Sequence, residues 1–146
     1  MDENGREVKK VCENIFVSFC YFIQGGGICV GVELPAGVRN VWVTNCTIEK
    51  SDRGIMVCSR QNNQGLGAIE NIHFRDIDIK QVGDWGFNVN LWYWIPSYMP
   101  NSFTSEDIRK IRHIYFENIH IGKAKGNPIQ ILGLAEQLYL MCIFGI

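Results

Sequence analysis

Two aspartates, Asp76 and Asp78, have a spacing that could support acid–base chemistry. They flank Ile77 in an alternating run, so both are expected to point outward from one strand, about 6.6 Å apart at roughly 3.3 Å per residue. Enzymes in which one carboxyl group acts as an acid and another activates water hold the two groups about 6.5–9.5 Å apart. The same outward positions elsewhere carry a varied set that is typical of a solvated face: Phe19 and Tyr21, Asn45 and Thr47, Asn118 and His120. Catalysis by the aspartate pair is therefore the weaker interpretation.

Aromatic residues gather in one segment, from about Asn90 to Lys110, with Trp85 just upstream. Flat π faces cover the apolar side of a sugar ring, so this cluster indicates a saccharide-binding surface; the alternative is that the rings pack the segment onto the structure beneath. Arg53 and Arg60 are the cations expected nearby, with a turn contact for Arg53 and a surface role for Arg60 as alternatives. The aromatic binding candidates are Trp92, Tyr93 and Trp94, with Tyr98 in the same segment.

Cysteine and histidine spacing predicts no metal site. The six cysteines contain no C-x-x-C pair and no histidine at metal-finger spacing. Because nearly all of them have Val, Ile or Phe neighbours, most are expected to be small buried hydrophobes. The glycines Gly25–Gly27 and Gly31 match neither nucleotide fingerprint and indicate a tight corner instead. The sequence therefore predicts no metal and no cofactor.

The overall composition narrows the class of protein and its partners. The chain has 146 residues, 47% of them hydrophobic and 20% charged, with a net charge of -1. This is a globular balance without the basic patch that nucleic acid or an anionic membrane would need. The longest apolar stretch, Leu132 to Ile146, is interrupted and too short for a membrane span. The acidic start, Met1 to Asn4, does not resemble a secretory signal, so the chain is expected either to stay inside the cell or to lack its true beginning.

An internal repeat organises the chain. A charged residue, an asparagine and an alternating apolar run recur at intervals of 26, 31 and 42 residues, and a second short alternating run follows each time. Alternation of this kind predicts strands. Units this small cannot bury an apolar face alone, so they must stack. A parallel β-helix and a leucine-rich horseshoe both fit a stack, but the Ile, Val, Phe and Cys ladder and the uneven intervals favour the β-helix. The four phrases begin at Cys12, Val38, Ile69 and Ile111.

Stacking the phrases aligns two columns of residues. Small or branched side chains are expected in an inward column, about 4.8 Å apart from coil to coil. The asparagine column is expected at tight corners, where asparagine tolerates a left-handed backbone and aligned amides can hydrogen-bond. The inward column is Cys20, Cys46, Ile77 and Ile119, and the corner column is Asn14, Asn40, Asn71 and His113.

The order of these motifs resembles glycoside hydrolase family 28, the polygalacturonase-like enzymes. The resemblance covers about residues 5 to 136 and is carried by Cys12–Ile15, Gly25–Glu33, Gly37–Val41, Asp52–Ile55, Ile69–Ile72 and Ile131–Glu136. It implies an all-β, right-handed, single-stranded parallel β-helix of about four to five coils. It also implies a pectic or related oligo- or polysaccharide as partner, and an extracellular or periplasmic location for an intact parent.

Several positions depart from what the resemblance implies. The catalytic aspartates of the family are expected upstream of Met1, so no catalytic residue is expected in this chain. The active-site histidine falls on Gly25 or its neighbour, and the Arg-x-Lys segment reads Met56-Val57-Cys58. Methionine and cysteine cannot grip a galacturonate carboxylate as cations do. A family tyrosine maps onto Trp92.

Three functional hypotheses follow for residues 1–146, taken as a single partial β-helix domain with an insertion at 90–110 and an aberrant tail at 137–146. The first is a fragment of a family 28 hydrolase that is inactive alone. The second is a non-catalytic carbohydrate-binding β-helix with an aromatic cleft. The third is a solenoid that self-associates, because ends without caps expose strand edges and apolar surface.

Overall fold

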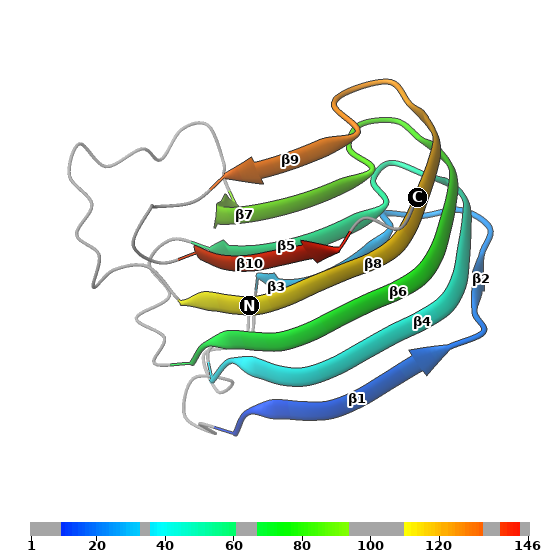
Figure 1. Ribbon diagram of the computed structural model, residues 1–146. Helices are drawn as coiled ribbons and strands as arrows, with labels where there is room; N and C mark the ends of the chain where they lie inside the picture. The colour runs from blue at the N-terminus through cyan, green and yellow to red at the C-terminus, as the bar shows by residue number, and fades with distance from the viewer. Residues whose placement is uncertain (1–9, 33–35, 61–66, 94–109, 133–137, 144–146) are drawn as a thin grey trace, which may run out of the picture.

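The computed structural model describes residues 10–32, 36–60, 67–93, 110–132 and 138–143. Within these ranges all strand pairing is parallel and no helix occurs, so none of the described segments could cross a membrane as a helix. Long strands form one sheet and short strands a second, and each long strand leads through a turn into a short one (Figure 1). This path is that of a parallel β-helix. The all-β fold predicted from the repeat is confirmed.

Strand order follows the order of the repeats. The long sheet contains β1 (Cys12–Ser18), β4 (Val38–Ser51), β6 (Ile69–Val82), β8 (Ile111–Ala124) and β10 (Leu138–Ile143), in that order, with the short β2 (Tyr21–Phe22) also paired with β4. The short sheet contains β3 (Ile28–Val32), β5 (Ile55–Arg60), β7 (Phe87–Tyr93) and β9 (Ile129–Leu132). In the long sheet Ile72 pairs with Val41 on one side and Ile114 on the other. The repeated phrase is therefore one coil.

Residues with positive φ bend the long strands at two places in each coil. The first series is the corner column predicted from the sequence, Asn14, Asn40, Asn71 and His113, with φ of 56–59°. The second series, which was not predicted, lies five residues further along: Phe19, Asn45, Asp76 and Asn118, with φ of 52–54°. A left-handed conformation costs most residues about 1–2 kcal/mol, and asparagine and aspartate tolerate it best because their side chains hydrogen-bond locally.

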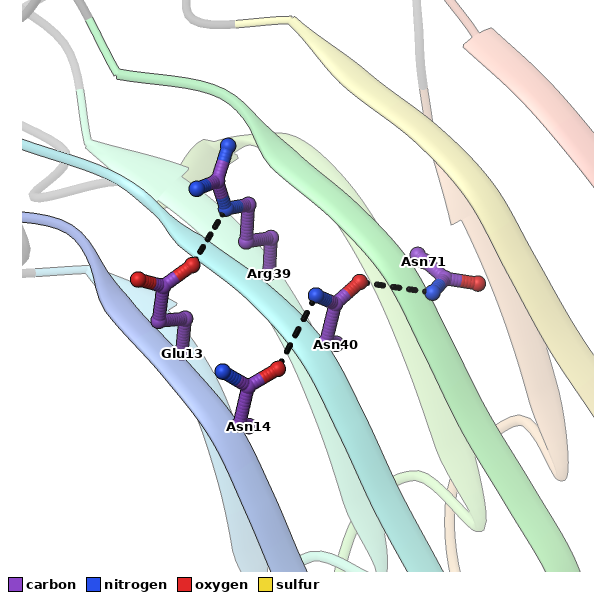
Figure 2. Close-up of polar contacts among 5 residues, drawn as sticks. All are labelled: Glu13, Asn14, Arg39, Asn40 and Asn71. Carbon is purple, nitrogen blue, oxygen red and sulfur yellow. Dashed lines mark hydrogen bonds and ion pairs between the residues drawn. The ribbon is translucent and has the colours of Figure 1, made fainter.

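The corner asparagines form a hydrogen-bonded ladder between coils (Figure 2). Asn40 donates from Nδ2 to Oδ1 of Asn14 at 3.1 Å, and Asn71 donates in the same way to Asn40 at 2.7 Å. Beside this ladder, Arg39 Nε donates to Glu13 Oε2 at 2.7 Å. These contacts confirm the structural role predicted for the asparagines.

The core lies between the two sheets and is built from inward columns. Cys46 pairs with Ile77, and Ile77 pairs with Ile119, as the repeat predicted. Cys46 and Ile77 are buried, and Ile119 is partly buried against the same core. Phenylalanines fill the widest part, since Phe116 stacks on Phe74 and on Phe87 with ring centroids 5.2 and 4.3 Å apart.

The cysteines are less uniformly buried than predicted. Cys46 and Cys58 are buried and Cys20 is half-buried, but Cys12 and Cys29 are exposed. Cys12 is exposed because it begins β1, the edge strand of the long sheet, which pairs only with β4 among the described strands. Cys29 is exposed because it alternates with the inward-facing Val30 on β3. Apolar sequence neighbours thus did not distinguish an inward from an outward position.

Aromatic side chains also form a column on the outer face of the long sheet, one from each coil. Trp42 stacks on Phe16 with ring centroids 4.7 Å apart, and His73 stacks on Trp42 at 5.6 Å and on Tyr115 at 4.4 Å. The ring planes lie within 11° of parallel. We call these four residues the aromatic column.

The structure describes parts of the two segments that were set apart in the sequence, the insertion and the tail. Residues 138–143, within the supposed aberrant tail, form β10, which pairs with β8 in parallel and has an irregularity between Tyr139 and Leu140. In this pairing Leu138 is the register partner of Ile111, and Leu140 is the register partner of Ile114. At the insertion, residues 90–93 belong to β7, and residues 94–109 lie outside the described part of the chain.

Candidate functional site

A polar hollow of about 270 Å³ opens at the turns that lead from the long strands toward the short strands. It is lined by Gln24, Gly25, Lys50, Ser51, Asp52, Gln81, Gly83 and Lys125. The backbone fixes its wall, because Asp52 N donates to Gly25 O at 2.9 Å and Gly83 N donates to Ser51 O at 3.0 Å. Its lining includes two lysines and one aspartate together with amide and hydroxyl residues, a combination that can hold a carboxylate or several sugar hydroxyls.

Arg53, which follows Asp52 in the chain, lies over an aromatic ring. Its guanidinium carbon is 5.5 Å from the centroid of the Trp85 ring, a cation–π arrangement. The two turns are joined by the N–H of Gly54, which donates to the carbonyl of Trp85 at 2.9 Å. Nε of Arg53 is buried and has no hydrogen-bond partner among the described residues. Arg53 and Trp85 therefore place a cation and an aromatic surface next to the hollow.

The outer face of the short sheet is a second polar feature. Met56, Cys58 and Asn88 are 6%, 0% and 1% exposed, yet none of them belongs to the core cluster between the sheets. Val57 and Val89, which alternate with them, do belong to it. These three side chains are therefore buried on the outer side. Asn88 donates to Gln130 Oε1 at 2.5 Å, while Asn88 Oδ1 has no partner among the described residues.

This face carries the positions at which the resemblance to family 28 expects cationic side chains. Met56 and Cys58 stand there, and Gly25 stands where a histidine is expected. A glycine at the fourth residue of β3 is also required by the backbone, since Gly31 has φ of +116° and a Cβ would lie 1.9 Å from the carbonyl oxygen of Cys58. The close approach of β3 and β5 therefore leaves no room for a side chain at position 31.

The other predicted binding residues lie apart from Arg53. Arg60 ends β5 and pairs in register with Tyr93 at the end of β7, directly after Trp92. At about 3.3 Å per residue, Arg60 is roughly 20 Å from Arg53 along the strand direction. One small ligand cannot reach both arginines, but an extended chain could. Trp94 lies outside the described residues.

Asp76 and Asp78 are already engaged by neighbouring side chains. Asp76 accepts from Asn118 Nδ2 at 2.6 Å, and Asp78 contacts Lys80 and accepts from the His120 ring at 2.9 Å. The hydrogen bond from Lys80, followed by that from His120, lowers the pKa of Asp78, which favours its charged form. A general acid needs a raised pKa instead.

The predicted geometry of this pair also needs correction. The separation of about 6.6 Å assumed a straight strand with regular alternation. Asp76 instead has φ of 54° and lies at the second bend of β6. A residue at such a bend does not share the regular outward direction of Asp78, so the strand spacing cannot be used to place the two carboxylates.

Among the described residues no three His, Cys, Asp or Glu side chains gather in a way that could hold a metal ion. His73 belongs to the aromatic column, and its Nε2 lies 2.7 Å from Asn71 Oδ1. His120 contacts Asp78, and His113 takes a place in the corner column. The three histidines thus have separate structural positions.

Sequence reasoning missed the lysines of the hollow. Lys50 and Lys125 are 75 positions apart in the chain, and they meet only because Lys50 aligns with Gln81 and Lys123 in the sheet. No sequence motif indicates that these two lysines line the same hollow. Extending the alignment of the repeats past each long strand into the following turn could have predicted it.

Comparison with known proteins agrees with the fold and with the repeated motifs. A model of the family described as Glycosyl hydrolases family 28 matches residues 6–137, which is most of the chain. A search of curated proteins finds no match. The parallel β-helix, the register of the repeated phrase and this match lead to one conclusion: the chain belongs to glycosyl hydrolase family 28.

Proposed function

We propose that this chain is part of a polygalacturonase-like glycoside hydrolase, in which it binds a pectic or related polysaccharide and does not hydrolyse it alone. The observation that carries the proposal is the placement of Arg53 over Trp85 beside the hollow that contains Lys50 and Lys125. A uronate unit offers a carboxylate for the cations and an apolar ring face for the aromatic surface. Trp92 and Tyr93, at the end of β7, would extend the contact along the polymer.

Two features support binding without hydrolysis by this chain. Asp76 and Asp78 are held in contacts with Asn118, Lys80 and His120. The outer face of the short sheet carries Met56 and Cys58 at the positions where cations are expected. Inverting hydrolysis needs one carboxylic acid and one carboxylate across the bond, and the family's paired aspartates would have to come from outside the residues of this chain.

A binding experiment with a matched pair of tryptophan variants tests the saccharide site. Affinity electrophoresis in gels containing polygalacturonate should show retarded migration of the wild-type chain. Trp85→Ala should weaken binding about fivefold, since a cation–π or stacking contact contributes about 1 kcal/mol. Trp42→Ala is the control, because both faces of that ring are already stacked, on Phe16 and on His73. Equal retardation of both variants and the wild type would contradict the proposed site.

The charge of the ligand is tested separately. Lys50→Gln combined with Lys125→Gln should reduce binding to oligogalacturonate and leave binding to neutral oligosaccharides unchanged. Lys80→Gln serves as the control because Lys80 pairs with Asp78 on the long sheet. In a reducing-end assay the wild-type chain should release no product. Product that is lost in the Asp76→Asn, Asp78→Asn double variant would instead show that this pair is catalytic.

Self-association is the second candidate, and the exposed apolar surface of the first coil favours it. Phe16, Phe19, Tyr21 and Ile23 are 71%, 82%, 60% and 70% exposed. Phe19→Asn is a well-matched test, because Asn45 and Asn118 occupy the same bend in other coils with the same positive φ. If the first coil mediates association, this variant should shift light-scattering mass toward the monomer. A wild-type chain that is monomeric at high concentration would remove this candidate.

A further inference from the structure

Three sulfur-bearing residues, Cys29, Met56 and Cys58, share the outer face of the short sheet. The Sγ atoms of Cys29 and Cys58 are 3.9 Å apart. Met56 is the register partner of Cys29 and lies two residues before Cys58, so it shares their face of the sheet. Cys29 is exposed to solvent, whereas Met56 and Cys58 are buried. The cluster therefore has one open side.

The local backbone explains why the two thiols meet although they are not register partners. Cys58 pairs with Gly31, which has no side chain to fill the place opposite it. Cys29, two residues earlier on the same face, can then reach diagonally toward Cys58. The positive φ of Gly31 and its close approach to the Cys58 carbonyl exclude any larger residue there. The meeting of the thiols is thus built into the pairing of β3 and β5.

The surroundings of the pair favour the reactive form of the exposed thiol. The hydrogen bond with Cys58 and then the positive charge of Arg53 lower the pKa of Cys29, while its partial burial acts in the opposite direction. Thiolates are the form that binds metal ions, and partly exposed, electropositive surroundings are typical of reactive cysteines.

We propose that Cys29 and Cys58, with Met56 beside them, form a binding site for Cu(I). A metal about 2.3 Å from each sulfur, the usual length of a metal–thiolate bond, would subtend an S–metal–S angle of about 116° at the observed separation of 3.9 Å. That angle is close to trigonal and leaves a third position open, for which Met56, on the same face of the sheet, is the proposed ligand. Thiolate and thioether ligands select Cu(I) among biological metals. Zinc would need four ligands, and no third His, Cys, Asp or Glu joins the pair among the described residues.

Binding follows a simple balance of charge. Each thiol releases its proton to solvent as its sulfur bonds to Cu(I), so the dithiolate complex carries one net negative charge. The guanidinium of Arg53 is close enough to favour the charged form of Cys29 and offsets this charge. No electron is transferred, because the ion is already in the reduced state when it binds.

A second pair of thiols in the same molecule provides an internal comparison. In the second pair, Cys20 and Cys46, burial raises the pKa of Cys46. Both thiols also donate to backbone carbonyls, Cys20 to Ser18 O at 3.5 Å and Cys46 to Thr44 O at 3.2 Å. Cys46 belongs to the core, and Cys20 packs against it. No positively charged side chain lowers the pKa of Cys46 as Arg53 lowers that of Cys29. We expect it not to take up Cu(I).

The test is anaerobic titration of the full, reduced chain with Cu(I) in the presence of bicinchoninate as a competing chelator. The wild-type chain should withdraw one equivalent of Cu(I) from the chelator. Cys29→Ser should lose this equivalent without loss of stability, because Cys29 is exposed. Cys58→Ser should lose it as well, and Met56→Leu should weaken it while both thiols remain titratable. X-ray absorption should show sulfur as the only ligand type.

Cys20→Ser is the matched control and should retain the bound equivalent. Cys29→Ser keeps the proposal testable even if the buried Cys58→Ser variant fails to fold. Uptake that is equal in wild type and Cys29→Ser, or that is lost in Cys20→Ser alone, would overturn the site. A purified chain whose mass is lower by two hydrogens, with Cys29 and Cys58 linked as a disulfide under these reducing conditions, would also overturn it.

Discussion

The first coil and the interior coils share the repeated sequence pattern, but their corresponding side chains are buried to different extents. Ile15 on β1 is half-buried, whereas Ile72 and Ile114, in the same column, are fully buried. Asn14 has one amide neighbour in its ladder and Asn40 has two. Phe16 stacks on one ring and His73 on two. In each column, the residue on β1 has a neighbour on one side only within the part of the chain that the structure describes.

This difference shows that burial in the solenoid is determined by neighbouring coils more than by residue type. The backbone angles are the same in both regions, because Asn14 and Asn40 have φ of 59° and 56°. What changes is the number of strands that flank each residue. Stability should therefore depend on position along the stack, as nearest-neighbour interactions predict.

The largest expected effect comes from a matched pair of core truncations. Ile72→Ala should cost about 2–5 kcal/mol of unfolding free energy, the usual range for truncation of a fully buried isoleucine. Ile15→Ala, in the same column but half-buried, should cost less than half as much, because fewer contacts are lost. Urea unfolding followed by tryptophan fluorescence checks both. Equal costs would show that the first coil is as well covered as the interior.

The asparagine ladder should give the next largest difference. Asn40→Ala loses hydrogen bonds to Asn14 and Asn71 and leaves alanine at a positive φ, which together should cost about 3 kcal/mol. Asn14→Ala leaves alanine at the same positive φ but loses one ladder bond, so it should cost about 2 kcal/mol. Asn40→Gly separates the two contributions, because glycine relieves the backbone cost and still removes the amide. A glycine variant as unstable as the alanine variant would assign the whole effect to the ladder.

The aromatic column should produce a smaller, pH-dependent effect. Burial, and then the charge of Arg75, lowers the pKa of His73 below its ordinary value of 6.5, although Glu117 opposes the shift. The folded state thus favours neutral His73, so its contribution to stability is present above about pH 6.5 and is lost as the pH falls through the folded pKa. His73→Phe keeps a ring between Trp42 and Tyr115 and should flatten the pH dependence of the urea midpoint. An unchanged slope between pH 7.5 and pH 5 would contradict this assignment.

The smallest effect is expected from the exposed ion pairs. Arg75 donates to both Glu117 oxygens, at 2.9 and 2.8 Å, in an interior position, whereas Arg39 donates to Glu13 on the first coil. Both pairs are largely solvated, so salt should screen them and their removal should change stability little. Arg75→Gln and Arg39→Gln should therefore be close to each other. A large difference between them would mean that coil position matters for surface charges as well as for the core.

Much of the fold could be predicted because an alignment of the repeated phrases gives the register of the paired strands. The column of Cys46, Ile77 and Ile119 and the left-handed asparagines follow directly from aligning the phrases. The second bend was not predicted, although Asn45, Asp76 and Asn118 are residue types that tolerate a left-handed backbone, because Phe19 stands at that position in the first coil. The pairing of β10 was missed because its sequence lacks the charged residue and asparagine or histidine that mark the other phrases.

The candidate site was less predictable because it depends on turns and on contacts between residues that are not register partners. The hollow brings Lys50 and Lys125 together through turns of different length, which the phrases do not align. The contact of Cys29 with Cys58 depends on the missing side chain of Gly31. Arg53 was a candidate cation from the sequence, but its contact with Trp85 joins two turns in successive coils and does not follow from the repeat.

The parallel register also affects how this chain folds during synthesis. Ladder partners lie 26, 31 or 42 residues apart, as Asn40 and Asn14, Asn71 and Asn40, and Glu117 and Arg75 show. A strand that leaves the ribosome therefore waits for dozens of further residues before its next partner exists. Contacts this distant in sequence form slowly, because loop closure must precede them. The growing chain always presents one unpaired strand edge, and translation speed should set how long that edge remains open.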